Sequence, residues 1–173
     1  MARFVRPSGE YEESVLSALV EFQHEGGLRG GDLAILAKDV AFDRIVQDLL
    51  DASLPDTPRP DGWVPQTTLW WVDDAEFIGM LEIRHGLTDE LRKVGGHIGY
   101  AVRPSARRRG HATAMLIASL PVAAELGIDP ALVTCLEGNV ASKKVIEIAG
   151  GTLAENAEGR LRFWVPTRKA NAR

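Results

Sequence analysis

The chain is poor in features that define several other protein classes. Its 173 residues include one cysteine, Cys135, so neither an intramolecular disulfide nor a multi-cysteine zinc site is available. Lys and Arg number 20 against 24 Asp and Glu, and a net charge of −4 excludes a nucleic-acid-binding surface spread over the whole chain. The longest uncharged stretch, 112–124, has 13 residues, whereas a membrane-spanning helix needs about 20. The N-terminal residues lack the apolar core of a secretion signal, so we expect a cytoplasmic protein without a membrane partner.

Several catalytic motifs are also missing. The sequence has no Gly-x-x-x-x-Gly-Lys-Ser/Thr, Gly-x-Gly-x-x-Gly, His-Glu-x-x-His or Gly-x-Ser-x-Gly pattern. The four histidines lie far apart in the sequence, with no closely spaced pair, and we expect no metal. A nucleoside triphosphatase, a dehydrogenase, a zinc protease and a serine hydrolase are therefore unsupported.

Hydrophobic periodicity divides the chain into two parts. Apolar residues at helical spacing predict helices over 10–25, ended by Gly26 and Gly27, and over 41–52, and the proline-rich segment 55–66 predicts a surface loop. From Thr67 the pattern predicts strands over 67–72, 76–85, 96–103, 131–136 and 160–165, and helices over 110–127 and 139–149. This order is typical of a single α+β or mixed α/β domain with one sheet.

The segment between the third strand and the helix over 110–127 is rich in cationic groups. Arg107, Arg108 and Arg109 are followed by Gly110, which opens directly onto the helix. The first turn of a helix has free backbone amides and a partial positive charge, and glycine lets a ligand approach the backbone closely. The sequence therefore predicts a phosphate-binding turn, with a solvated basic turn as the alternative.

Two motifs resemble those of the GNAT superfamily, the acyl-CoA-dependent N-acetyltransferases. The run Val102-x-Pro104-x-x-Arg107-x-x-Gly110-x-Ala112 is similar to the family's Arg/Gln-x-x-Gly-x-Gly/Ala signature. Downstream, the segment from Asn139 to Gly151 resembles the family's Asn-x-x-Ala/Ser helix. The resemblance implies a single mixed, mostly antiparallel sheet flanked by helices, with a splayed central strand pair. It further implies one domain over 1–173, in which residues 1–66 shape the acceptor side and residues 67–173 bind acetyl-CoA.

The resemblance also implies the coenzyme contacts. Backbone groups of the strand would bind the pantetheine arm, the loop amides would hold the pyrophosphate, and the second helix would contact the acetyl end or the outer phosphate. These residues are Ala101, Val102 and Arg103 on the strand, Arg107, Arg108, Arg109, Gly110, His111, Ala112 and Thr113 in the loop, and Asn139, Ser142, Lys143 and Lys144 on the helix. The alternative for Asn139 is a helix N-cap, and the two roles can coexist.

Direct acetyl transfer needs a base for the amine and preferably an acid for the departing thiolate. Many family members supply the base from the position that corresponds to His97, and Glu82 on the preceding strand is the competing base. Arg84 and His85 could orient the substrate. The family's usual acid is a tyrosine where this chain has Ile146, so Ser142, Tyr100 or water would replace it.

These observations predict an N-acetyltransferase that moves an acetyl group from acetyl-CoA to a primary amine of a small molecule or peptide in a ternary complex. The first alternative is a non-catalytic acyl-CoA-binding or sensing module, since the acid position is lost. The second is nucleic-acid binding through the arginine cluster with Trp70 and Trp71, which the charge balance disfavours. Family members often dimerise, so the chain could form a homodimer.

Overall fold

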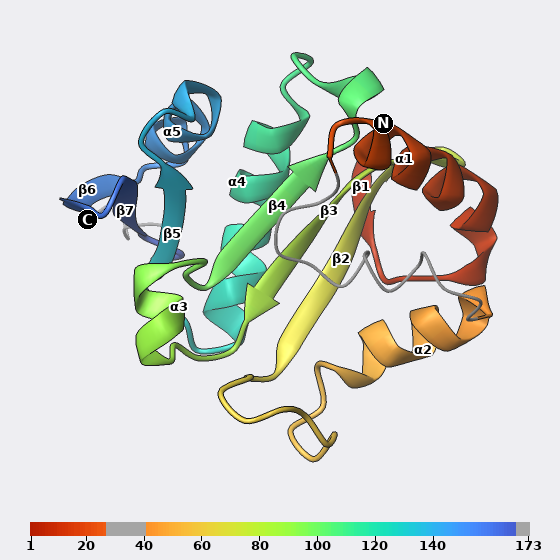
Figure 1. Cartoon of the computed structure of the whole chain (residues 1–173), viewed down its shortest axis with the longest axis horizontal. Helices are drawn as coiled ribbons and strands as arrows, with labels where there is room; N and C mark the ends of the chain where they lie inside the picture. The colour runs from red at the N-terminus through yellow and green to blue at the C-terminus, as the bar shows by residue number, and fades with distance from the viewer. Residues whose placement is uncertain (27–40, 169–173) are drawn as a thin grey trace.

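A computed structural model describes residues 1–26 and 41–168 of the chain (Figure 1). Gly27, one of the two glycines expected to end the first helix, lies outside these residues. The helices are α1 (Glu12–His24), α2 (Phe42–Asp51), α3 (Asp89–Lys93), α4 (His111–Glu125) and α5 (Val140–Ile148), with short 3₁₀ turns at Gly9–Tyr11 and Pro104–Ala106. The strands are β1 (Arg3–Val5), β2 (Gln66–Asp73), β3 (Glu76–Arg84), β4 (Ile98–Val102), β5 (Ala131–Leu136), β6 (Thr152–Ala157) and β7 (Arg160–Val165).

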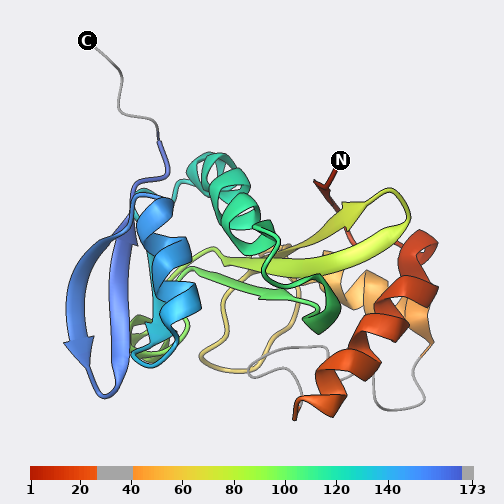
Figure 2. The ribbon, with the colours of Figure 1, turned by 90° about the horizontal axis from the view of Figure 1, so that it is seen from above.

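The first sheet is antiparallel and has the order β1-β2-β3-β4. Successive side chains of a strand point to opposite faces, so Trp70 and Trp71 enter different cores. Trp70 packs edge-on against Phe77 under α1 and α2, whereas Trp71 packs against Phe4 on the face that α4 covers. Figure 2 shows this layering, with α4 on one side of the sheet and α1 and α2 on the other.

A second antiparallel sheet has the order β5-β7-β6. The expected single sheet is thus divided in two, because β4 and β5 spread apart from a narrow joint (Figure 1). At that joint Gly96 forms an isolated bridge with Val133, and the His97 N–H donates to the Leu132 carbonyl at 2.7 Å. A β-carbon at Gly96 would overlap the Leu132 carbonyl oxygen, so this close approach requires glycine. The divergence agrees with the expected splayed strand pair.

Two helices flank the opening between the sheets. Gly110, with a φ of 83°, is the N-cap of α4, and Asn139 caps α5 by accepting a hydrogen bond from the Ser142 N–H at 3.1 Å. Pro121 lies within α4, which continues through it to Glu125. Met115 and Leu116 of α4 are fully buried against the sheet. The two helices therefore begin next to the ends of the diverging strands.

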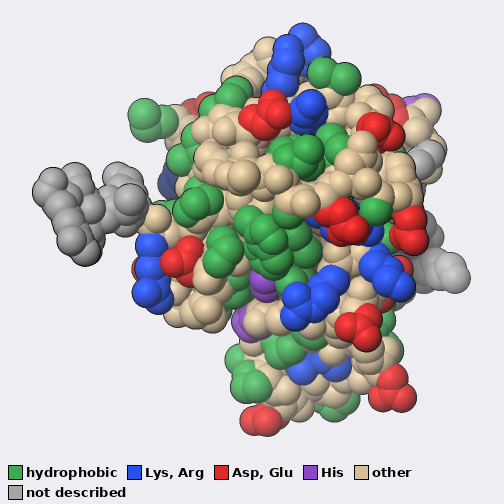
Figure 3. Space-filling model, turned by 90° about the vertical axis from the view of Figure 1, so that its left-hand side faces the viewer, with side chains coloured by type: hydrophobic (Ala, Val, Ile, Leu, Met, Phe, Trp, Pro, Cys, Tyr) green, Lys and Arg blue, Asp and Glu red, His purple; other side chains and the backbone are tan. Residues whose placement is uncertain are grey.

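The surface was searched for features of other protein classes. None of the helices in the described ranges is long and apolar enough to cross a membrane, and these ranges contain no group of three metal-ligating side chains. On the face shown in Figure 3, hydrophobic side chains gather near the centre, and Lys and Arg alternate with Asp and Glu around them. That face therefore has no continuous field of one sign.

Candidate functional site

A cavity of about 560 Å³ lies between the diverging strands β4 and β5. Its walls come from β3, β4, β5 and the start of α5, together with residues after α3 and the first residue of β7. Among the predicted site residues, Glu82, Arg84, Ala101, Asn139 and Ser142 line this cavity. The sheet divergence therefore brings together residues that are as much as 60 positions apart in the sequence.

Tyr100 and Ser142 face each other across the cavity. The phenol oxygen of Tyr100 lies 2.7 Å from Oγ of Ser142, so the side chain of β4 is joined to the first turn of α5. Burial raises the pKa of Tyr100 to about 12, although its hydrogen bond with Ser142 acts in the opposite direction. The phenol is therefore protonated at neutral pH. Burial also raises the pKa of the Cys135 thiol, which argues against a cysteine nucleophile.

Glu82 and Arg84 form a charged pair on the opposite wall. They lie two residues apart on β3 and share one face of the strand. Nη2 of Arg84 lies 3.2 Å from Oε2 of Glu82, and Nη1 donates to the Gly96 carbonyl at 3.3 Å. Gly99 leaves room for the pair over β4, because a β-carbon there would lie 3.5 Å from Nη1 of Arg84. The cavity thus contains a carboxylate beside a proton-donating hydroxyl pair.

His97 lies at the joint of the two sheets and does not line the cavity. Its Nδ1 accepts a hydrogen bond from the Leu132 N–H at 2.9 Å, so the proton of the neutral ring is on Nε2. Burial, with the nearby charges of Arg92 and Arg84, lowers the pKa of His97 to about 4. The ring is therefore neutral at pH 7 and joins β4 to β5.

His85 is also separate from the cavity. Its Nε2 lies 2.8 Å from Oγ1 of Thr67, and burial together with the charge of Arg59 lowers its pKa. The structure therefore separates His85 from Arg84, although both were expected to orient the substrate.

The arginine-rich turn forms a second site at the start of α4. Arg108 has a left-handed φ of 64°, and the next residues lead into the helix through the left-handed Gly110. The side chains of Arg108 and Arg109 are exposed. Arg107 instead donates from Nε to the Val102 carbonyl at 3.0 Å and pairs with Glu25 at 2.7 Å. The amides in the first turn of α4, over 111–113, have no acceptors within the helix and can hold an anion.

Other contacts near this turn involve its histidine. Nδ1 of His111 accepts a hydrogen bond from Nε1 of Trp71 at 3.3 Å, which holds α4 against β2. Neither Trp70 nor Trp71 lines the cavity, and both are buried. The alternative of nucleic-acid binding with these aromatic side chains therefore loses its stacking surface.

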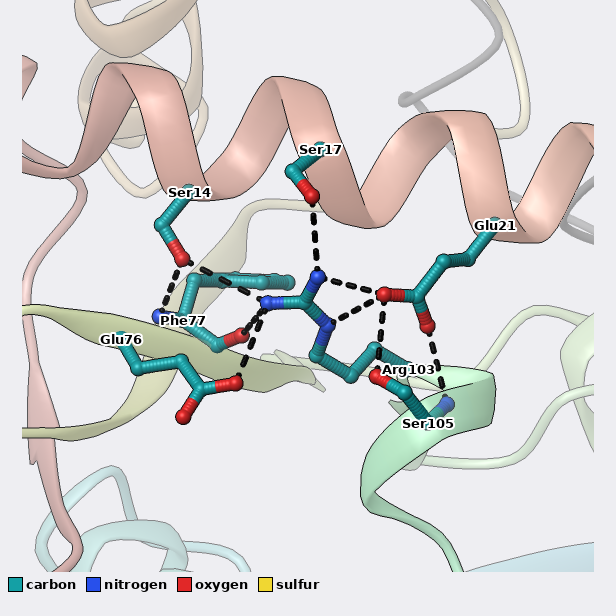
Figure 4. Close-up of polar contacts among 7 residues, drawn as sticks. All are labelled: Ser14, Ser17, Glu21, Glu76, Phe77, Arg103 and Ser105. Atoms are coloured by element: carbon teal, nitrogen blue, oxygen red, sulfur yellow. Dashed lines mark hydrogen bonds and ion pairs between the residues drawn. The ribbon is translucent and has the colours of Figure 1, made fainter.

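Arg103 does not belong to the exposed basic turn (Figure 4). Its guanidinium is buried between α1 and β3, where Nε donates to Glu21 at 2.9 Å and Nη1 to the Phe77 carbonyl at 3.1 Å. Counting Arg103 with the other arginines of this segment was therefore wrong for its side chain. Its amide also donates to the Ile78 carbonyl at 2.9 Å and is occupied within the sheet. A strand residue points opposite to its neighbours, which is why Arg103 leaves the turn.

The same network fixes the start of the turn. Glu21 accepts hydrogen bonds from both the N–H and the Oγ of Ser105, each at 2.9 Å. Although burial acts to raise its pKa, the bonds from Arg103 and Ser105 lower the pKa of Glu21. Helix α1 thus holds the arginine-rich turn in place through a charged network.

The α5 residues separate by helix face. Asn139 and Ser142 point into the cavity, whereas Lys144 is exposed and Lys143 pairs with Glu147 at 3.8 Å. Ile146 is fully buried in the core, so no proton donor stands at that position. The N-cap role of Asn139 is confirmed, and the residue also lines the cavity.

Sequence reasoning missed Arg160 and Thr134. Thr134 lines the cavity and accepts a hydrogen bond from the Gly95 N–H at 3.2 Å. Arg160 also lines the cavity, at the start of β7 and opposite Leu136 in the register. The alternation of the last strand could have indicated that Arg160 shares a face with Arg162, but nothing in the sequence placed that face beside β4.

The sequence matches one protein family model. Residues 45–152 match the acetyltransferase (GNAT) domain, which is more than half of the chain. A comparison with curated proteins finds no significant match.

Solved structures share the fold. The chain resembles the GNAT domain of S. lividans PAT (TM-score 0.62, 19% identity, 95% of this chain and 90% of that chain). It also resembles yncA from Salmonella typhimurium, solved with acetyl-CoA (TM-score 0.63, 12% identity, 99% and 96%). A third similar structure is Mycobacterium smegmatis RimJ in complex with CoA-disulfide (TM-score 0.64, 20% identity, 95% and 80%). These similarities confirm the expected fold.

Proposed function

This chain belongs to the GNAT acetyltransferase family, and from that premise we propose that it transfers the acetyl group of acetyl-CoA to a primary amine of a small molecule or peptide. Transfer is direct, in a ternary complex of the enzyme with both substrates. The observation that carries the proposal is the cavity between β4 and β5, in which a carboxylate and a hydroxyl pair lie on opposite walls.

The turn before α4 fits the phosphates of acetyl-CoA. Gly110 supports this role, because a side chain there is absent and open space surrounds the position of a β-carbon. The amides over 108–113 would accept the pyrophosphate, and the exposed Arg108 and Arg109 would add charge-assisted hydrogen bonds. Arg107 shapes the turn through its bonds to Val102 and Glu25.

The opening between the sheets fits the pantetheine arm. Backbone groups alternate direction along a strand, and the Arg103 amide points to β3, so the groups of Tyr100 and Val102 point toward β5. They could pair with the amides of the arm, while Asn139 and Ser142 contact its thioester end. The sequence favoured Ala101 and Arg103 as well, but their contribution would be packing along the strand.

We assign the base role to Glu82 in preference to His97. Glu82 lines the cavity, and Arg84 stabilises its negative charge through their ion pair. His97 lies outside the cavity, and its lowered pKa makes it a weak base. Glu82 would take a proton from the ammonium group of the acceptor, directly or through water, so that the amine can attack.

Tyr100 supplies the proton for the departing thiolate in this proposal. During transfer the amine nitrogen bonds to the acetyl carbon, the carbon–sulfur bond breaks, and CoA leaves as the thiol once its sulfur gains a proton. Tyr100 is protonated at neutral pH and reaches the cavity from β4, and Ser142 orients its hydroxyl at 2.7 Å. This pair would replace the acid that Ile146 cannot supply.

The two parts of the chain have different roles in this domain. Residues 67–173 carry the coenzyme contacts, and residues 1–66, with α1 and α2, cover the face of the sheet on which Glu82 and Arg84 lie. We assign the acceptor to that side of the cavity.

The test is turnover with acetyl-CoA and a panel of amines. Release of the CoA thiol and a gain of one acetyl group in a product, measured by mass spectrometry, are the expected results. Tight binding of acetyl-CoA without turnover on any amine would instead support the sensing module. Salt-dependent binding to an oligonucleotide that CoA does not compete with would support a nucleic-acid site at the arginine turn.

A further inference from the structure

The cavity carries an uncompensated positive charge. Its charged lining residues are Glu82, Arg84 and Arg160, and the first two form an ion pair at 3.2 Å. Within residues 1–26 and 41–168, no carboxylate lies within ion-pair distance of Arg160. Arg160 is partly buried at the start of β7, where it pairs in register with Leu136. The guanidinium thus faces the cavity without a counter-charge from the described chain.

The neighbouring arginine of β7 shows what a structural arginine looks like in this sheet. Arg162 is buried, pairs with Glu155 at 2.7 Å, and donates to the Lys93 carbonyl at 3.3 Å, which ties β7 to α3. Arg160 lies on the same face two residues earlier and has none of these bonds. Its guanidinium donors are available to a ligand.

The phosphates of the coenzyme do not account for this charge. The residues proposed to hold them, over 107–113, are absent from the lining of the cavity. The pantetheine arm, proposed to lie in the opening, carries no ionised group. The remaining ligand of the cavity is the acceptor itself.

From these observations we infer that the acceptor is an amine that also carries an anionic group, a carboxylate or a phosphate, and that Arg160 binds this group. The inference rests on the proposed function. Glu82 would receive the ammonium end of the acceptor, and Arg160, across the opening on the other sheet, would receive the anionic end. A planar guanidinium binds either anion through paired hydrogen bonds.

The experiment uses matched pairs of amines that differ only in the anionic group. One arm compares glycine and other amino acids with their carboxamides, and the second compares phosphoethanolamine with ethanolamine. The wild type should favour one anionic series by at least about tenfold in kcat/KM. Arg160→Gln should remove this preference by raising KM for the anionic member, with KM for acetyl-CoA unchanged. Arg92→Gln, an exposed arginine of α3 outside this cavity, is the control variant.

Other outcomes would overturn the inference. These are turnover without preference for the anionic member, an equal effect of Arg160→Gln on both members, or a raised KM for acetyl-CoA in that variant. If no amine is acetylated, the proposed function fails separately, and calorimetric titration of the same compounds into the CoA-bound protein decides the binding site. Binding that Arg160→Gln weakens would retain the site, and absence of such binding would reject it.

Discussion

The phenol of Tyr100 donates to or accepts from the hydroxyl of Ser142 at 2.7 Å, across the opening that separates the two sheets. This contact joins β4 to α5 at a point where the backbones of the two sheets have parted. It places a protonated hydroxyl in the cavity that also holds Glu82. Its proposed role in catalysis can be tested directly.

Tyr100→Phe should lower kcat by about a hundredfold, because it removes the proton donor while keeping the ring. KM for acetyl-CoA should change little. Ser142→Ala, which keeps the phenol but loses its partner, should cause a smaller decrease. Steady-state release of the CoA thiol measures both variants. An unchanged kcat in Tyr100→Phe would exclude Tyr100 as the acid and favour water.

Glu82→Gln should lower kcat most strongly at neutral pH, because the amide cannot accept a proton from the acceptor ammonium. At higher pH more of the acceptor is already a free amine, so the difference from the wild type should narrow. The pH–rate profiles of the two proteins measure this effect. If His97→Asn, rather than Glu82→Gln, reproduces this profile, the base is His97.

Gly110→Ala should weaken CoA binding by about tenfold or more, because a β-carbon hinders both the left-handed backbone and the approach of the phosphates. Gly127→Ala is the matched control. Gly127 follows the same helix with a φ of 79°, and neither glycine has a neighbour within 4 Å of its β-carbon position. Both substitutions strain the backbone similarly, so only a loss of affinity confined to Gly110→Ala supports the phosphate turn. Calorimetric titration with CoA measures the difference.

Arg103→Met should lower the free energy of unfolding by about 3 kcal/mol, because it leaves the carboxylate of Glu21 without its buried partner. Arg44→Met removes an exposed pair with Asp48 on α2 and should cost less than about 1 kcal/mol. Urea denaturation of both variants gives the comparison. Equal effects would show that the network in Figure 4 contributes no more than a surface ion pair.

His97 should make stability depend on pH. In the unfolded chain a histidine gains its proton near pH 6.5, whereas in the folded protein the pKa of His97 is about 4. Between these values the unfolded state binds more protons, so stability is fully present above pH 6.5 and falls as the pH decreases toward 4. His97→Asn keeps an acceptor for the Leu132 amide and should lose less stability over this interval. Parallel pH dependences of the urea midpoint would contradict this account.

The sequence predicted the elements whose apolar residues follow a clear period. It missed β6, because the residues Thr152–Ala157 are mostly exposed and polar and show no β-type alternation. It also missed β1, which has three residues, and α3, a five-residue helix capped by Thr88. Short or solvent-exposed elements depend on their neighbours for stability, so local composition carries little signal for them.

The coenzyme turn could be predicted because its residues are contiguous, whereas the cavity could not. Glu82 and Ser142 could be named as candidates from their motifs and strands, but their meeting depends on the angle between two sheets. Arg160 shows the same limit, since its position beside the opening follows from strand order rather than from its neighbours in the chain. Arg103 shows the converse, because contiguity with three exposed arginines suggested a shared role that strand alternation prevents.

The glycine at the joint of the sheets gives the enzyme a fulcrum. Gly96 and the carbonyl of Leu132 are in such close contact that any added atom must push β4 and β5 apart. A small rotation at this point becomes a larger displacement at the far ends of the two strands, where the reacting groups lie. Substrate range in this protein can therefore be adjusted by residues that never touch a substrate, through the angle at which the two sheets meet.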